Sequence, residues 1–136
     1  MNENMLAATL HAEWNPKPEY EPTPKDIPEK LTYLGGMVWR NPKLKLERKP
    51  IPKIEQDEVL IGVRACGICG SDVHMYEATP EGYIKYPGLT AFPVTLGHEF
   101  SGEILEVGEK AYDEGGRKFE KGGAVCAEEM IWCGYC

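Results

Sequence analysis

The sequence lacks a long apolar run, and this absence argues against a membrane-spanning helix. Apolar stretches such as Val59–Val63 are far shorter than the roughly 20 residues that such a helix needs. The first residues, Met-Asn-Glu-Asn, contain neither a basic region nor a sustained apolar stretch, so no secretory signal peptide is predicted. A cytoplasmic location follows as the default expectation.

The chain also lacks an excess of basic residues. It has 22 acidic against 15 basic side chains and a formal net charge of −7, which repels phosphate backbones. A solvated strand edge explains its densest basic group at least as well as a binding surface does. That group is Lys43, Lys45, Arg48 and Lys49. We therefore expect no nucleic-acid partner, and the lack of a long apolar run argues against a membrane partner.

The five cysteines are an odd number, which favours metal ligands or reduced thiols over a disulfide framework. With 42% hydrophobic and 27% charged residues, the 136-residue chain has the composition of a globular domain. Prolines gather near the start, where residues 14–28 read WNPKPEYEPTPKDIP. Because each proline fixes φ and removes a backbone donor, we expect an extended strap at residues 1–30, anchored by Trp14 and Tyr20.

The remainder, residues 31–136, has the pattern of a β domain. Val59, Ile61, Val63 and Ala65 lie two apart and would share one face of a strand. Further strands are expected within residues 44–47, 100–107 and 124–127, separated by glycine and proline. Short strands with little helical periodicity predict a Greek-key or barrel-like β domain.

Residues 65–74, ACGICGSDVH, hold two thiols, a hydroxyl, a carboxylate and an imidazole. A redox disulfide, half of a zinc knuckle and the ligand loop of a catalytic metal are all compatible with this stretch. Zinc accepts thiolate and imidazole ligands, and a catalytic site uses three protein ligands and keeps one position open. Cys69 and His98, the latter in the stretch TLGHE, are the candidate ligands.

Four neighbouring side chains fit supporting roles at such a site. Glu99 would bring a second-sphere or alternate oxygen ligand, and Asp72 could accept the N–H of a ligating histidine. Ser71 and His74 lie two and five residues after Cys69 and could pass a proton to solvent.

The chain ends with Cys133-Gly-Tyr-Cys136, a cysteine pair with no partner pair after it. Two thiolates cannot complete a tetrahedral zinc shell. We therefore expect the sequence to be the front part of a longer chain.

Three motifs in order resemble those of the zinc-dependent medium-chain alcohol and polyol dehydrogenases: residues 67–74 (GICGSDVH), 97–102 (GHEFSG) and 133–136 (CGYC). The resemblance implies a mainly β, chaperonin-10-like (GroES-like) catalytic domain, a partly open β-barrel with few short helices. It also implies that residues 31–136 stop within the lobe that carries a structural zinc. No GxGxxG occurs, so the family's Rossmann domain is expected outside these residues.

The resemblance also implies roles for individual residues. Cys69 and His98 would bind the catalytic zinc, with a third ligand later in the chain, and Glu99 would lie beside the metal. Ser71 and His74 would form the proton relay, and Asp72 would support the zinc histidine. Two further residues, Cys133 and Cys136, would supply half of a four-cysteine structural zinc site.

The implied activity is hydride transfer from an alcohol or polyol to NAD or NADP. The nucleotide would bind to the absent domain, so these 136 residues alone are expected to be inactive, and the full-length protein is expected to be a homo-oligomer. Trp39, the strap and the loop at residues 81–88 look most like the bacterial scyllo-inosose 3-dehydrogenase branch, which acts in inositol catabolism.

Two other classes compete with this interpretation. Cys66, Cys69 and the terminal pair could form a non-catalytic four-cysteine zinc module, although the pairs lie much farther apart than the usual ~15–20 residues. Cys66 and Cys69 alone could form a thiol redox pair. Two interpretations are open for the aromatic residues at 76–92. They could line a substrate cleft, or they could pack against the protein and hold a surface loop in place.

Overall fold

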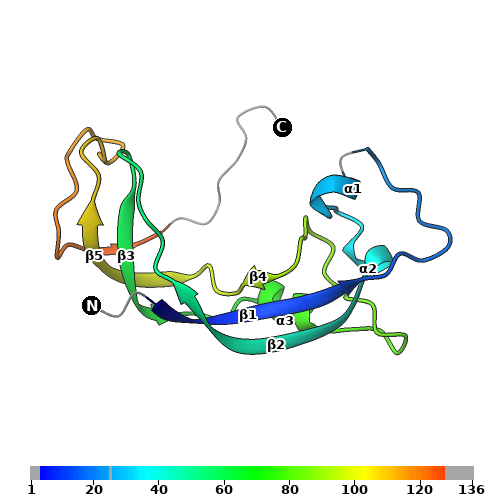
Figure 1. Ribbon diagram of the computed structural model, residues 1–136. Helices are drawn as coiled ribbons and strands as arrows, with labels where there is room; N and C mark the ends of the chain where they lie inside the picture. Colours follow the sequence, from blue (N-terminus) through cyan, green and yellow to red (C-terminus); the bar gives the residue numbers. More distant parts are fainter. Residues whose placement is uncertain (1–3, 25, 128–136) are drawn as a thin grey trace. The chain divides into compact units, whose positions relative to one another are not determined.

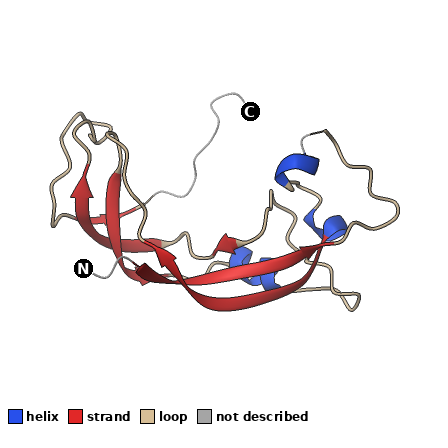
Figure 2. Cartoon of the chain, viewed as in Figure 1, coloured by secondary structure: helices blue, strands red, loops and turns tan. Residues whose placement is uncertain are grey.

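The computed structural model describes residues 4–24 and 26–127, and these form short helices and strands of unequal length (Figures 1 and 2). The prediction of a mainly β domain with few short helices is confirmed, and the described residues form two three-stranded sheets without a closed barrel. The elements are β1 (Asn4–Trp14), α1 (Asp26–Glu29), α2 (Gly35–Val38), β2 (Trp39–Pro50), β3 (Val59–Cys66), α3 (Gly70–Tyr76), β4 (Val94–Thr95), β5 (Phe100–Val107) and β6 (Ala124–Cys126). No described helix is long and apolar enough to cross a bilayer.

The chain divides into two compact units that interleave along the sequence. The first comprises the described residues up to Lys49 together with Cys69–Leu96. The second comprises Pro50–Ile68 together with the described residues from Gly97 onward.

The sheet of the first unit has the strand order β2-β1-β4 (Figure 1). β1 pairs antiparallel with the short β4, where Thr9 lies opposite Thr95 and Leu10 opposite Val94. Leu10 is fully buried, whereas the outer strand β2 leaves its central Leu46 71% exposed.

An aromatic core holds the first unit together. Trp39 is buried and makes edge-to-face contacts with Trp14 and Phe92, at centroid distances of 5.0 and 5.1 Å. Such pairs add to the free energy gained by burying apolar area. The other buried members of this cluster are Tyr20, Val38 and Ile84.

The expected strap is present only in part. Asn15 and Lys17 donate backbone hydrogen bonds to α2, at 2.7 and 2.8 Å, and the buried Tyr20 ring packs edge-on against Trp14. We expected residues 4–14 to lie within the strap, but they form β1. This stretch contains no proline, and the sheet buries Leu10 and its neighbours. Pro28 lies in the single turn of α1.

The loop after α3 packs as a turn on the start of β2. Asn41 donates its backbone N–H to Gly82 at 2.8 Å, and Ile84 donates to Trp39 at 3.1 Å. Lys17 and Arg40 both place their charges over the Tyr83 ring, 4.7 and 5.4 Å from its centroid. The buried Tyr83 therefore favours the packing interpretation of this loop over a substrate-lining one.

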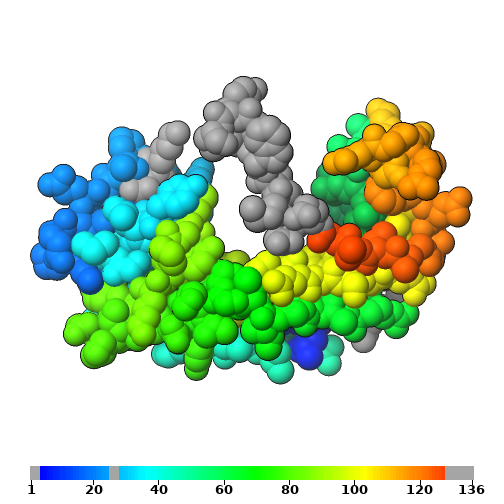
Figure 3. All heavy atoms as spheres, turned by 180° about the vertical axis from the view of Figure 1, so that it is seen from behind, coloured from blue at the N-terminus to red at the C-terminus, as the bar shows by residue number. Residues whose placement is uncertain are grey.

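The second unit contains the sheet β3-β5-β6, which is antiparallel throughout. In Figure 3 the yellow β5 and the orange and red residues that follow it pack together. All three predicted strands of this sheet are confirmed within a residue or so of their expected bounds. The expected single face of β3 is not regular, because register shifts at Leu60/Ile61 and Val63/Ala65 interrupt the alternation and leave Val63 56% exposed.

We predict that Ile84→Ala lowers the free energy of unfolding by about 2–5 kcal/mol, because Ile84 is 1% exposed within the aromatic core and its loss leaves a cavity. Urea unfolding followed by tryptophan fluorescence measures the change. The control, Leu46→Ala at an exposed position of β2, should change it by no more than about 0.5 kcal/mol. Equal effects of the two substitutions would contradict this description of the core.

Candidate metal centre

The candidate centre is built on the pairing of β3 with β5. Cys66 lies opposite Phe100, and the next residue, Gly67, donates its backbone N–H to the Glu99 carbonyl at 2.7 Å. The ladder therefore continues one residue beyond the regular strands. Glu99 is fixed by this bond, and Cys69 follows Gly67 with only Ile68 between them.

Gly97 allows the chain to turn just before His98. Its φ of +96° lies in the region that favours glycine. A Cβ at this position would lie 2.6 Å from the Cys66 sulfur, so the turn packs directly on that thiol. Cys66 thus supports the backbone that carries His98.

The backbone around Cys69 is held by a helix cap. Cys69 is the N-cap residue of α3, and its backbone N–H donates to the Asp72 carboxylate at 3.0 Å. The two residues form a capping box, which fixes the start of a helix. Asp72 is only 7% exposed, so its carboxylate is a buried part of this cap.

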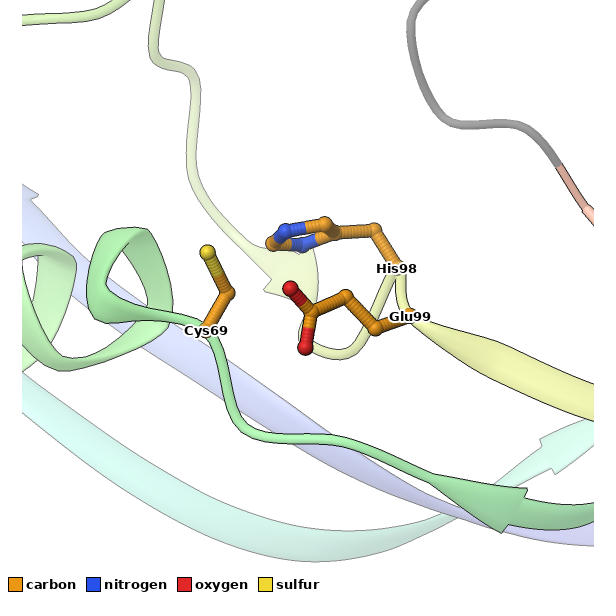
Figure 4. Close-up of side chains that lie close together, drawn as sticks. All are labelled: Cys69, His98 and Glu99. Carbon is orange, nitrogen blue, oxygen red and sulfur yellow. The ribbon is translucent and has the colours of Figure 1, made fainter.

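Three potential metal ligands come together here (Figure 4). The Cys69 sulfur, a ring nitrogen of His98 and a carboxylate oxygen of Glu99 all lie within 4.8 Å of one another. Protein zinc sites bind thiolate, imidazole and carboxylate ligands at 2.0–2.3 Å, with the ligand atoms roughly 3.5 Å apart. Sulfur, nitrogen and oxygen donors of this kind fit zinc.

The remaining predicted site residues are the two on α3 and the two terminal cysteines. Ser71 and His74 both lie on α3, Ser71 partly buried and His74 exposed. The Nδ1 atom of His74 lies 3.2 Å from the Glu77 carboxylate. Cys133 and Cys136 lie outside the described residues. Their assignment to a structural zinc therefore stays a prediction.

Sequence reasoning missed one partner of a predicted site residue. Glu77 was not singled out, although the spacing His74-x-x-Glu77 on a helix places the two side chains on one face and could have indicated the pair. The sequence left Cys66 open as a zinc ligand or a redox thiol, and no sequence signal indicated that Gly97 packs against its sulfur.

Residues 55–136, more than half of the chain, match the family described as the alcohol dehydrogenase GroES-like domain. The chain belongs to this family. The match begins just before β3 and includes every residue of the candidate centre.

Several proteins with assigned names are similar to this chain. The scyllo-inosose 3-dehydrogenase of Thermotoga maritima is 58% identical over 97% of this chain and 34% of its own length. The sorbitol dehydrogenase of Bacillus subtilis is 42% identical over 69% of the chain and 24% of its own length. A solved Thermotoga maritima structure assigned as an alcohol dehydrogenase aligns over 96% of the chain and 34% of its own length, with 56% identity and a TM-score of 0.87. The chain thus spans about a quarter to a third of the length of these relatives, and the two named enzymes are dehydrogenases.

We predict that Gly97→Ala weakens Zn²⁺ binding about tenfold or more, because the added methyl would strike the Cys66 sulfur and strain the turn before His98. Competition with a chromophoric chelator measures the affinity. Gly116→Ala is the matched control, since Gly116 also has a positive φ, +78°, but has no atom within 4 Å of an added Cβ. Unchanged zinc affinity in the Gly97 variant would show that this turn does not position the ligand.

Proposed function

We propose that this chain is the catalytic-domain part of a zinc-dependent dehydrogenase that oxidises a secondary alcohol, polyol or cyclitol to a ketone, with NAD or NADP as the hydride acceptor. The observation that carries the proposal is the grouping of Cys69, His98 and Glu99 within 4.8 Å. Membership of the alcohol dehydrogenase GroES-like family supports it, as do the dehydrogenase relatives.

The ligand residues each have a defined part in this proposal. Cys69 and His98 would hold the zinc, and Glu99 would lie beside it as an alternate oxygen donor. The bound ion would supply Lewis-acid chemistry, polarising the oxygen of an alcohol and lowering its pKa. The capping box between Cys69 and Asp72 would keep the thiolate in place while substrate enters and product leaves. Support of the zinc histidine by Asp72 is part of the same proposal.

Ser71 and His74 would move the proton that the alcohol loses. Both lie on α3 close after Cys69, and the exposed imidazole of His74 can exchange protons with water. The hydroxyl of Ser71 can accept a proton and donate another in the same step, which is the property that a relay needs.

The names of the relatives support a substrate class for this proposal. The two named enzymes are an inosose and a sorbitol dehydrogenase, and both named compounds carry hydroxyl groups. The 58% identity to the scyllo-inosose enzyme favours a cyclitol-type substrate. A nucleotide-binding domain, a structural zinc that includes Cys133 and Cys136, a homo-oligomeric state and a cytoplasmic location complete the proposal for the intact protein.

The grouping around Cys69 also weighs against the competing classes. A four-cysteine module would use the Cys69 thiolate together with three other sulfurs, whereas the structure gives it imidazole and carboxylate neighbours. A thiol redox pair would not need either of these neighbours. The catalytic-type site is therefore the better supported function.

We predict that Cys69→Ser or His98→Ala in the intact protein removes one equivalent of zinc and abolishes NAD(P)-dependent alcohol oxidation, because each substitution deletes a ligand. Metal analysis and a reduced-nicotinamide absorbance assay measure the two losses. The control is Cys126→Ser, an exposed thiol of β6 outside the grouping, which should keep both. Full zinc content in the His98 variant would refute the assignment of this ligand.

We predict that Ser71→Ala and His74→Ala each slow alcohol oxidation by about 10²-fold while the zinc content stays unchanged, because they interrupt proton transfer and not metal binding. Steady-state kinetics and metal analysis on the same preparations measure the two quantities. Loss of zinc in either variant, or full activity, would remove that residue from the relay.

A further inference from the structure

A carboxylate stands next to the histidine of the proposed relay. The Glu77 carboxylate oxygen Oε2 lies 3.2 Å from Nδ1 of His74, across one turn at the end of α3. His74 is the basic residue of the last helical turn, and Glu77 is the C-cap residue. The imidazole ring of histidine can accept and release protons near neutral pH. A side chain that binds this ring therefore affects how His74 would act in the proposed relay.

Backbone hydrogen bonds on both sides hold Glu77 in place. Its N–H donates to the Val73 carbonyl at 2.8 Å and closes the helix, while its own carbonyl accepts the N–H of Lys85 at 3.1 Å. The adjoining Ala78 pairs with Ile84, which is 1% exposed in the aromatic core. The Glu77 carboxylate therefore extends from a backbone that is anchored to both the helix and the core.

We propose that Glu77 is a positioning residue that selects the tautomer of His74. An ionised carboxylate can only accept hydrogen bonds, so the Nδ1 atom that faces it must carry the proton. The neutral ring then keeps its lone pair on Nε2, which becomes the single proton acceptor. For the relay this fixes both the orientation of the ring and the identity of the accepting atom.

The catalytic consequence rests on the proposed function. When the alcohol O–H bond breaks, the relay delivers the proton to Nε2 of His74, where a new N–H bond forms. The ring becomes an imidazolium whose charge lies beside the Glu77 carboxylate, and the proton is then released from Nε2 to water. The tautomer is thereby restored for the next turnover.

The effect of Glu77 on the His74 ring can be tested without unfolding the chain. The side chains of His74 and Glu77 are 57% and 44% exposed, and ion pairs in such surroundings contribute little to stability. Substitutions of Glu77 should therefore leave the chain folded. Their effect should appear in the state of the imidazole and in proton transfer.

The direct test is nitrogen-15 NMR of His74 in alkaline buffer, where the ring is neutral. The unmodified chain should show the Nδ1–H tautomer, and Glu77→Ala should shift His74 to the Nε2–H tautomer that a solvated histidine favours. Glu77→Gln should retain part of the Nδ1–H form, since its carbonyl oxygen can still accept the hydrogen bond. The control is Glu81→Ala, which removes a different carboxylate four residues away. A hydrogen bond from Thr79 lowers the pKa of Glu81. An unchanged His74 tautomer in Glu77→Ala would overturn the proposal.

Kinetics of the intact protein separate this proposal from the function on which it rests. Glu77→Ala should lower kcat about three- to tenfold with KM and zinc content unchanged, and Glu77→Gln should recover part of the loss. If the tautomer shifts but neither Glu77→Ala nor His74→Ala changes kcat, Glu77 positions the ring and the relay assignment fails. If kcat falls while the tautomer does not shift, Glu77 acts in another way and the positioning proposal fails.

Discussion

The hydrogen bond from the Gly67 N–H to the Glu99 carbonyl is the constraint on which the candidate centre depends. It extends the β3–β5 ladder by one pair, so two segments about 30 residues apart in sequence leave the sheet from a common point. His98 and Glu99 lie on one segment, and Cys69 follows closely on the other. Ordinary strand pairing thus fixes the points at which the chain enters the segments that carry the candidate ligands.

Two smaller devices refine this placement. The Gly97 turn rests on the Cys66 sulfur, and the capping box of Cys69 with Asp72 fixes the first turn of α3. Together they explain the dense motif at residues 65–74, because one cysteine supports the histidine turn while the other is a candidate ligand. The hydroxyl of Ser71 and the imidazole of His74, the two proposed relay residues, both follow on α3.

Much of this could be predicted from the sequence, for identifiable reasons. Strands β3, β5 and β6 have clear ends in glycine, and the family motifs name Cys69 and His98 as ligands. β1 was missed because the neighbouring prolines dominated the interpretation of residues 1–30. The register shifts in β3 and the contact of Cys66 with Gly97 depend on tertiary pairing, which local patterns do not encode. The Glu77 partner of His74 was visible as helical spacing, but only once α3 was known to include His74.

The central claim is that one zinc ion is bound jointly by Cys69 and His98. X-ray absorption at the zinc edge of the intact protein, recorded before and after His98→Ala, tests it most directly. The account predicts a mixed shell of nitrogen, oxygen and sulfur in the unmodified protein. In the variant the zinc shell should contain sulfur alone, contributed by the structural site. Sulfur coordination alone in the unmodified protein, with no change on substitution of His98, would contradict the account.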